Sequence, residues 1–150
     1  MITKGGCMKK YAIALVVLFI VACGHSDLAE NAYKTADEWG NDTENISWKP
    51  AFLPAESGHI KEIHNLITNE IIGTYHYKET PFEEGAELKI MTRNTFQLQL
   101  QRLSSIPLPR WFITDKEVSK KKDIRVYQSE QWYIVDDFRE KTVFFVKIPG

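Results

Sequence analysis

Six short stretches of the chain have either the residue types or the two-residue alternation of β-strands. They are residues 59–66, 70–78, 88–91, 124–128, 132–135 and 142–148. The polar break at Thr68-Asn69 predicts that the first two stretches form a hairpin, in which Gly73 marks a bulge or a close backbone approach. Turns at 129–131 and 136–141 separate the last three, which predict an antiparallel meander.

One stretch has the period of a helix. From Phe96, apolar residues stand at i, i+4 and i+7 on one face of a helix that spans 92–103, and Thr92 or Asn94 can cap its start. The alternation of apolar residues with Gln over 96–101 makes a strand the competing interpretation. We favour the helix because Leu and Gln are good helix formers and two prolines follow it.

Together these elements predict an α+β fold with a mostly antiparallel sheet and one packed helix. The domain is expected to span residues 48–150. It begins with a segment, 48–54, whose two prolines exclude a regular helix or a central strand. Residues 114–123 are predicted to be a polar loop.

The first residues follow another pattern. Lys9 and Lys10 precede an apolar run of 12 residues, Tyr11–Ala22, and Cys23 follows it directly. A run of this length suits a signal peptide and is shorter than the roughly 20 residues of a bilayer-spanning helix. A buried core helix would show polar positions on one face, and this run shows none. An ordinary signal peptide is the remaining alternative.

The segment Ile20-Val21-Ala22-Cys23 resembles the lipobox of bacterial lipoproteins, in which an aliphatic residue stands three positions before the cysteine and a small one directly before it. The resemblance implies that residues 1–22 are a cleaved signal peptide, with Met8 as the better start. It also implies that lipid on Cys23 holds the protein to a membrane. Gly24 in place of aspartate favours the outer membrane, with the domain facing the periplasm.

Residues 23–47 are expected to be the lipidated cysteine and a polar tether, because apolar residues are sparse there. A short helix capped by Asp27 and ending at Gly40 is a weaker expectation for the same segment.

Composition and charge narrow the function. The chain has 150 residues and a net charge of -1, and its length suggests one domain. Without the first 22 residues it keeps 16 basic and 20 acidic residues, which disfavours nucleic acid and anionic lipid as electrostatic partners. Cys7 and Cys23 are the only cysteines, so the domain has no disulfide, thiol nucleophile or cysteine metal site.

Histidines are the first candidates for a site. His59, His64 and His76 lie on the predicted hairpin near Glu62, and two of the imidazoles could approach each other. Zinc sites need three or four ligands at known spacing, and residues five apart on one strand face opposite sides. We therefore expect no metal and no cofactor.

Other reactive residues are less suggestive. The pairs at 83–84 and 136–137 are adjacent carboxylates in predicted turns, unlike the facing carboxylates of glycosidases. Ser57 precedes His59 without a Gly-x-Ser-x-Gly elbow, and no phosphate-binding motif occurs. The lysines of 116–122 indicate a solvated loop. We therefore expect no enzymatic activity.

One aromatic segment is a candidate for partner binding. Arg110, Trp111 and Phe112 lie beside two prolines, and Trp and Arg are frequent in interface hot spots. Core packing is the alternative for the two rings.

These inferences predict a lipid-anchored protein of the bacterial envelope whose small domain is a non-catalytic protein-interaction module. Its expected partners are the membrane, through lipid on Cys23, and an envelope protein, with nucleic acid excluded. The alternative is a lipid-anchored immunity, exclusion or inhibitor protein. A small-ligand carrier or hydrolase ranks third.

Overall fold

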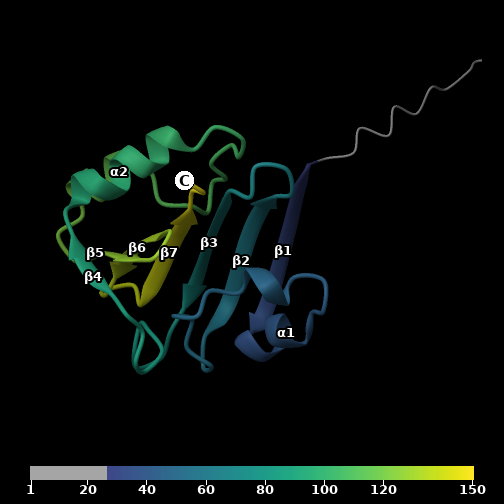
Figure 1. Ribbon diagram of the computed structural model, residues 1–150. Coiled ribbons are helices and arrows are strands. Elements are labelled where there is room, and N and C mark those ends of the chain that lie inside the picture. The colour runs from purple at the N-terminus through teal and green to yellow at the C-terminus, as the bar shows by residue number, and fades with distance from the viewer. Residues whose placement is uncertain (1–26) are drawn as a thin grey trace, which may run out of the picture.

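The computed structural model describes residues 27–150, in which seven strands form one antiparallel sheet in the order β1-β2-β3-β7-β6-β5-β4 (Figure 1). The strands are β1 (Leu28–Thr35), β2 (Gly58–Asn65), β3 (Ile71–His76), β4 (Lys89–Met91), β5 (Ile124–Ser129), β6 (Trp132–Asp137) and β7 (Thr142–Lys147). The helices are α1 (Ala36–Asn41), the 3-10 turn η1 (Ile46–Trp48), α2 (Arg93–Arg102) and α3 (Asp115–Lys120). The predicted signal peptide and Cys23 lie outside the described residues.

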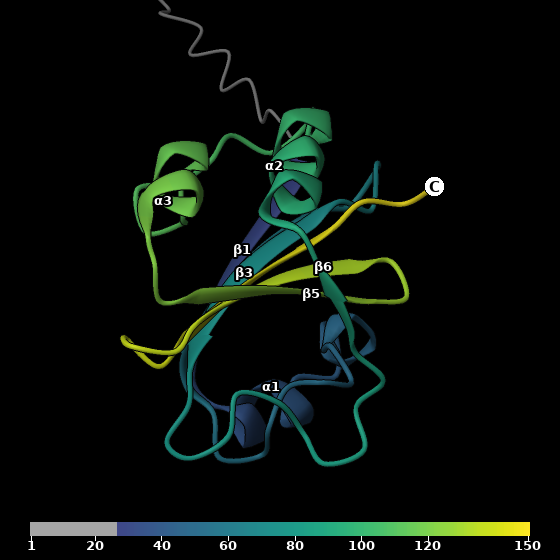
Figure 2. The ribbon, with the colours of Figure 1, turned by 90° about the vertical axis from the view of Figure 1, so that its left-hand side faces the viewer.

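Helices cover both faces of the sheet, so each face carries its own hydrophobic core. Figure 2 shows α2 and α3 on one side of the strands and α1 on the other. The core of the α1 face includes Trp39, Phe52, Ile60, Tyr75 and Phe145. The core of the α2 face includes Ile72, Phe96, Phe112, Val118 and Val135. The fold is therefore α+β, as predicted, and mostly sheet.

The predicted hairpin is confirmed as β2 and β3, which pair with Ile63 opposite Ile72. Gly73 lies at a close approach of backbone and ring. A Cβ added there would stand 2.1 Å from the Phe145 ring and 2.9 Å from the Lys61 carbonyl oxygen. Only glycine fits this position, because a Cβ would overlap a buried ring and a backbone atom. The register shift of the hairpin lies in β2, between Gly58 and Lys61.

The predicted C-terminal meander is confirmed as β5, β6 and β7. The first turn closes between Ser129 and Trp132. The second is shorter than predicted, because β6 continues through Asp137, which pairs with Thr142 of β7. The two acidic residues of this turn are therefore strand residues, and both are buried.

The predicted helix is confirmed as α2, and Thr92 caps it by accepting a hydrogen bond from the Thr95 amide. The prediction of a loop over 114–123 is wrong for its first half. α3 begins there with a capping box, in which Thr114 and Glu117 each bond the other's backbone amide. Val118 is fully buried and anchors this helix to the α2 face.

The prediction of a polar tether is wrong from Leu28 onward, and so is the domain boundary at Trp48. Residues 28–35 form the edge strand β1, which pairs along its length with β2. β1 exposes half of its residues and buries only one, because it lies at the edge of the sheet, and this gives the segment the composition of a spacer. Tyr33, Ala36 and Trp39 are buried in the core of the α1 face.

Candidate functional site

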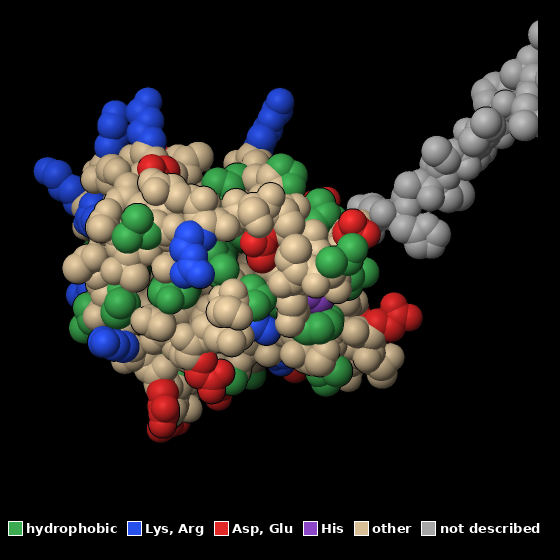
Figure 3. Space-filling view, turned by 45° about the horizontal axis from the view of Figure 1, so that its top comes forward, with side chains coloured by type: hydrophobic (Ala, Val, Ile, Leu, Met, Phe, Trp, Pro, Cys, Tyr) green, Lys and Arg blue, Asp and Glu red, His purple; other side chains and the backbone are tan. Residues whose placement is uncertain are grey.

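An acidic groove lies between the connection from β3 to β4 and the turn from β5 to β6. It has a volume of about 880 Å³. Four exposed carboxylates line it, those of Glu83, Glu84, Glu87 and Glu130, against the single amine of Lys89. Figure 3 shows acidic side chains gathered at the lower edge of the molecule, where this connection lies in Figure 1. A groove with this charge favours a cationic ligand.

Specific contacts hold the two walls of the groove in place. The Glu83 amide donates to the Phe52 carbonyl oxygen at 2.9 Å, and the Glu83 carboxylate accepts from the Ala55 amide at 3.3 Å. β4 pairs with β5 so that Lys89 lies opposite Gln128, which brings the second wall next to the first. The carboxylates come from segments about 45 residues apart, and strand pairing alone brings them together.

Aromatic rings lie beneath the acidic rim. Phe52 and Trp132 line the groove and meet edge to face, with ring centroids 5.8 Å apart. The Lys147 amine lies 5.5 Å from the centre of the Trp132 ring, within the range of a cation–π contact. The Trp132 ring therefore already contacts one cation of the protein itself.

A second hollow, of about 450 Å³, lies on the α2 face. Its lining residues are His59, Lys61, Thr74, His76, Trp111, Lys121, Asp137, Glu140, Thr142 and Phe144. This histidine hollow unites two of the predicted histidines with one residue of the predicted partner-binding segment. The His59 and His76 rings meet edge to face with centroids 5.7 Å apart.

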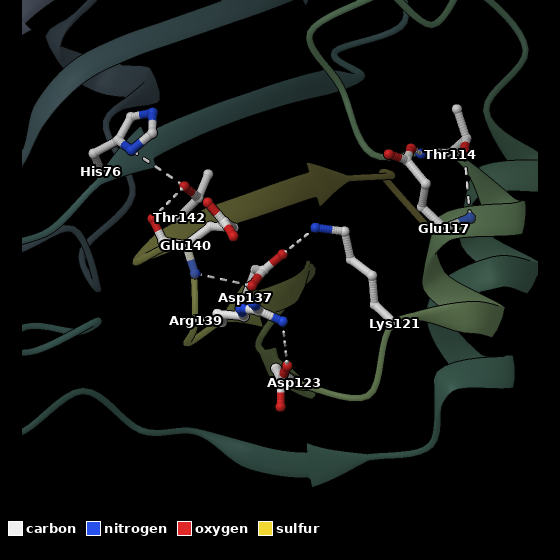
Figure 4. A network of polar contacts seen from close by, with 9 residues as sticks. All are labelled: His76, Thr114, Glu117, Lys121, Asp123, Asp137, Arg139, Glu140 and Thr142. Carbon is white, nitrogen blue, oxygen red and sulfur yellow. Dashed lines mark hydrogen bonds and ion pairs between the residues drawn. The ribbon is translucent and has the colours of Figure 1, made fainter.

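The Thr142 hydroxyl links His76 to the β6–β7 turn (Figure 4). It lies 3.0 Å from the Glu140 carbonyl oxygen and 3.1 Å from Nδ1 of His76. Nδ1 of His76 is therefore engaged with Thr142. Burial lowers the pKa of His76, and the neighbouring His59 and Lys61 lower it further.

An ion pair closes the other side of the histidine hollow (Figure 4). Nζ of Lys121 lies 2.5 Å from Oδ2 of Asp137, whose side chain is 3% exposed. Oδ1 of the same carboxylate accepts from the Glu140 amide at 3.1 Å. Both oxygens of Asp137 are thus engaged in contacts that join α3 and the β6–β7 turn.

The paired carboxylates considered from the sequence do not form a catalytic pair. Asp136 and Asp137 are consecutive residues of β6 and therefore face opposite sides of the sheet. Asp136 accepts a hydrogen bond from the Tyr77 hydroxyl at 3.0 Å, and burial raises its pKa. Glu83 and Glu84 lie on the exposed rim of the acidic groove.

His64 lies away from the other two predicted histidines. It is buried on the α1 face, where its ring lies 4.1 Å from that of Trp48 and its Nε2 lies 3.2 Å from Oδ1 of Asn69. Burial lowers its pKa. Among residues 27–150, no group of three or more metal-ligating side chains is placed to hold an ion.

The predicted partner-binding segment is split by the fold. Arg110 is exposed and Trp111 is half-buried at the histidine hollow. Phe112 is 3% exposed and packs edge to face on Phe144, with centroids 5.7 Å apart. The prediction is wrong for Phe112, because its ring belongs to the core of the α2 face.

No protein-family model, no curated protein and no solved structure matches this chain at a significant level. In the part of the chain that the structure describes, the helices are too short or too polar to cross a bilayer. The function is therefore inferred from the chemistry of the acidic groove and the histidine hollow.

Proposed function

We propose that this chain is a lipoprotein of the bacterial envelope whose domain binds a positively charged segment of a partner protein in the acidic groove, without catalysis. Lipid on Cys23 holds the protein to the outer membrane, facing the periplasm. The acidic groove is the observation that supports the binding role, since it combines a concave shape, an excess of negative charge and the Trp132 ring in its lining.

The composition of the groove fits a lysine or arginine side chain. The exposed carboxylates of Glu84, Glu87 and Glu130 offer charge-assisted hydrogen bonds to ammonium or guanidinium groups. The half-buried Trp132 ring offers apolar surface for the aliphatic part of such a residue. Interfaces draw most of their affinity from contacts of this kind at their centre.

The proposed anchor places the domain close to the membrane. Four residues, 24–27, separate Cys23 from Leu28 at the start of β1. An extended chain of this length reaches at most about 18 Å. A partner would therefore be another molecule at or near the same membrane.

A lipid-anchored immunity, exclusion or inhibitor protein is a narrower version of this proposal. The charge of the groove favours it, because a basic effector protein presents the cationic side chains that the groove suits. Resistance of the cell to a basic effector tests it. Deletion of the gene should abolish this resistance, and a gene that carries Glu84→Lys should fail to restore it.

Crosslinking in the cell tests the binding role. A photoreactive phenylalanine analogue placed at Glu84 should give a discrete crosslinked product with a protein of the envelope. The same analogue at Lys116, an exposed residue on α3, is the matched control and should give none. Equal products at both positions, or no product at Glu84, would contradict the proposal.

Charge reversal tests the chemistry of the groove. Glu84→Lys should abolish the crosslinked product formed from a second probe at Glu87, because it places an amine where the partner's cation binds. Glu30→Lys makes the same change of net charge on the exposed edge strand β1 and should leave that product unchanged. If both variants lose it equally, the effect is one of overall charge and the groove is not the site.

A further inference from the structure

The turn between β2 and β3 presents two large apolar side chains to solvent. Leu66 is 59% exposed and Ile67 is 73% exposed, and they are adjacent in the chain. Single exposed apolar residues are ordinary, but two adjacent ones form a small apolar patch that a membrane or another molecule can cover. The turn lies at one end of the sheet (Figure 1).

This turn lies beside the start of the domain. The Leu66 amide donates to the Asp27 carbonyl oxygen at 2.8 Å, and Leu28 lies opposite Asn65 in the β1–β2 ladder. Figure 1 shows the turn next to the point where β1 begins. The two exposed side chains are therefore at the end of the molecule from which the chain leads back to Cys23.

The conformation of the turn is well defined by hydrogen bonds. Oδ1 of Asn65 accepts from the amides of Ile67 at 2.9 Å and Thr68 at 2.8 Å. The Thr68 hydroxyl contacts that of Ser105 at 2.8 Å. These contacts fix the backbone that carries the two apolar side chains. Their insertion into another surface therefore costs no additional ordering of the backbone.

We propose that Leu66 and Ile67 insert shallowly into the lipid surface that carries the Cys23 anchor, and so hold the domain in one orientation on the membrane. The inference rests on the proposed lipid anchor. The occupant is lipid because the five peptide links between Cys23 and Leu28 leave the turn within reach of the bilayer.

Two apolar side chains alone bind a membrane weakly, but anchoring makes their insertion an intramolecular event at high local concentration. The polar groups around them, Thr68 and Ser105, suit the hydrated headgroup layer. Asp27 and Glu70 are the acidic residues beside the turn, so the contact depends on apolar insertion and not on attraction to anionic lipid.

The orientation has a consequence for the acidic groove. The loop that carries Glu83, Glu84 and Glu87 lies at the end of the molecule away from the β2–β3 turn (Figures 1 and 2). With the turn on the membrane, these carboxylates point away from anionic lipid and toward the aqueous compartment. The proposed partner then reaches the groove without crossing the bilayer surface.

Depth-dependent quenching tests the proposal. The mature lipidated chain, which begins at Cys23 and lacks Cys7, carries no free thiol. Ile67→Cys can therefore be labelled with an environment-sensitive fluorophore and reconstituted into phosphatidylethanolamine and phosphatidylglycerol vesicles. We expect a blue shift of emission and loss of fluorescence when the lipid carries a shallow nitroxide quencher. Ile90→Cys on β4, which replaces an isoleucine that is 77% exposed, should show neither change.

Each result has one meaning. A label at position 67 that stays unquenched on a chain with lipidated Cys23, as mass spectrometry of the same sample establishes, would overturn the docking and leave the anchor intact. A chain without lipid on Cys23 would overturn both. A blue shift without nitroxide quenching, together with a crosslinked dimer or a bound protein, would show that a protein covers the turn and would also overturn the proposal.

Discussion

Nδ2 of Asn31 on β1 donates a 2.6 Å hydrogen bond to Oε1 of Glu62 on β2, whose carboxyl is fully buried. Within residues 27–150, Oε2 of Glu62 has no hydrogen-bond partner, and neither has Nδ1 of the buried His64 two residues further along the strand. Burial raises the pKa of Glu62 to about 7, and the Asn31 bond only partly offsets this. The contact between β1 and β2 therefore includes a buried carboxyl group, and the fold is more stable when this group is protonated.

We predict that Glu62 makes the protein less stable as the pH rises. Its folded pKa of about 7 exceeds the ordinary value of 4.5, so the folded state binds more protons than the unfolded state between these values. The contribution of Glu62 to the free energy of unfolding is greatest below pH 4.5. It falls as the pH rises through about 7, by up to about 3 kcal/mol in total. Urea unfolding at pH 5 and pH 8 measures it.

The matched variant for this prediction is Glu62→Gln, which keeps the shape and removes the titration. The loss of unfolding free energy between pH 5 and pH 8 should shrink in the variant by most of that amount. Equal losses in the two proteins would show that Glu62 is not the group responsible.

Gly73→Ala should destabilise the fold by about 1–3 kcal/mol, because the new Cβ overlaps the Phe145 ring and the Lys61 carbonyl oxygen. Gly40→Ala in α1 is the control, since the nearest atom to its Cβ is a flexible amine 3.6 Å away. Thermal unfolding followed by circular dichroism compares the two. A variant at position 73 as stable as that at position 40 would contradict the steric argument.

The two ion pairs of Figure 4 should differ in their contribution to stability. Lys121→Met leaves the buried Asp137 carboxylate without its cation and should lower the free energy of unfolding by about 1–3 kcal/mol. Arg139→Met breaks the exposed pair with Asp123, whose atoms are 3.8 Å apart, and should cost less than about 0.5 kcal/mol. Chemical denaturation of both variants checks the order, and a reversed order would refute it.

Lys61→Gln should raise the pKa of His76. Burial is the largest cause of the lowered pKa and is unchanged by the substitution, but the positive charge of Lys61 contributes to it. The expected rise is small, since burial is unchanged and the charge of Lys61 is screened by solvent. Proton NMR titration of the histidine ring signals measures it, with His64 on the other face as the internal reference. An unchanged His76 titration would show that Lys61 does not act on it.

Local patterns were enough to predict most of the regular elements. The hairpin of β2 and β3, the meander of β5 to β7 and the helix α2 follow from alternation, residue type and the Thr92 cap. α3 was missed although its capping box, Thr114 with Glu117, is visible in the sequence. It was missed because a helix of six residues with one buried apolar side chain carries almost no periodic signal.

The edge strand and the groove depended on long-range pairing. β1 has the composition of a spacer, and only its ladder with β2 makes it a strand. The acidic groove joins Glu87 to Glu130 through the pairing of β4 with β5, which local patterning does not encode. The two histidines that meet, His59 and His76, were identified by residue type, but the separation of His64 from them depends on which face each strand position takes.

The amino-acid sequence by itself determined the α+β class and the main hairpin and helix, because these depend on short-range geometry and on side-chain type. It marked Gly73 as a bulge or a close approach, and the Phe145 ring from β7 decided in favour of the close approach. The tertiary structure alone decided that the segment after Asp27 belongs to the sheet, that Phe112 is core, and that the carboxylates of two distant turns form one groove. The physical reason is that an edge strand, a buried ring and a shared groove each require a partner far away in the chain, and burial against that partner supplies the free energy that no local pattern contains.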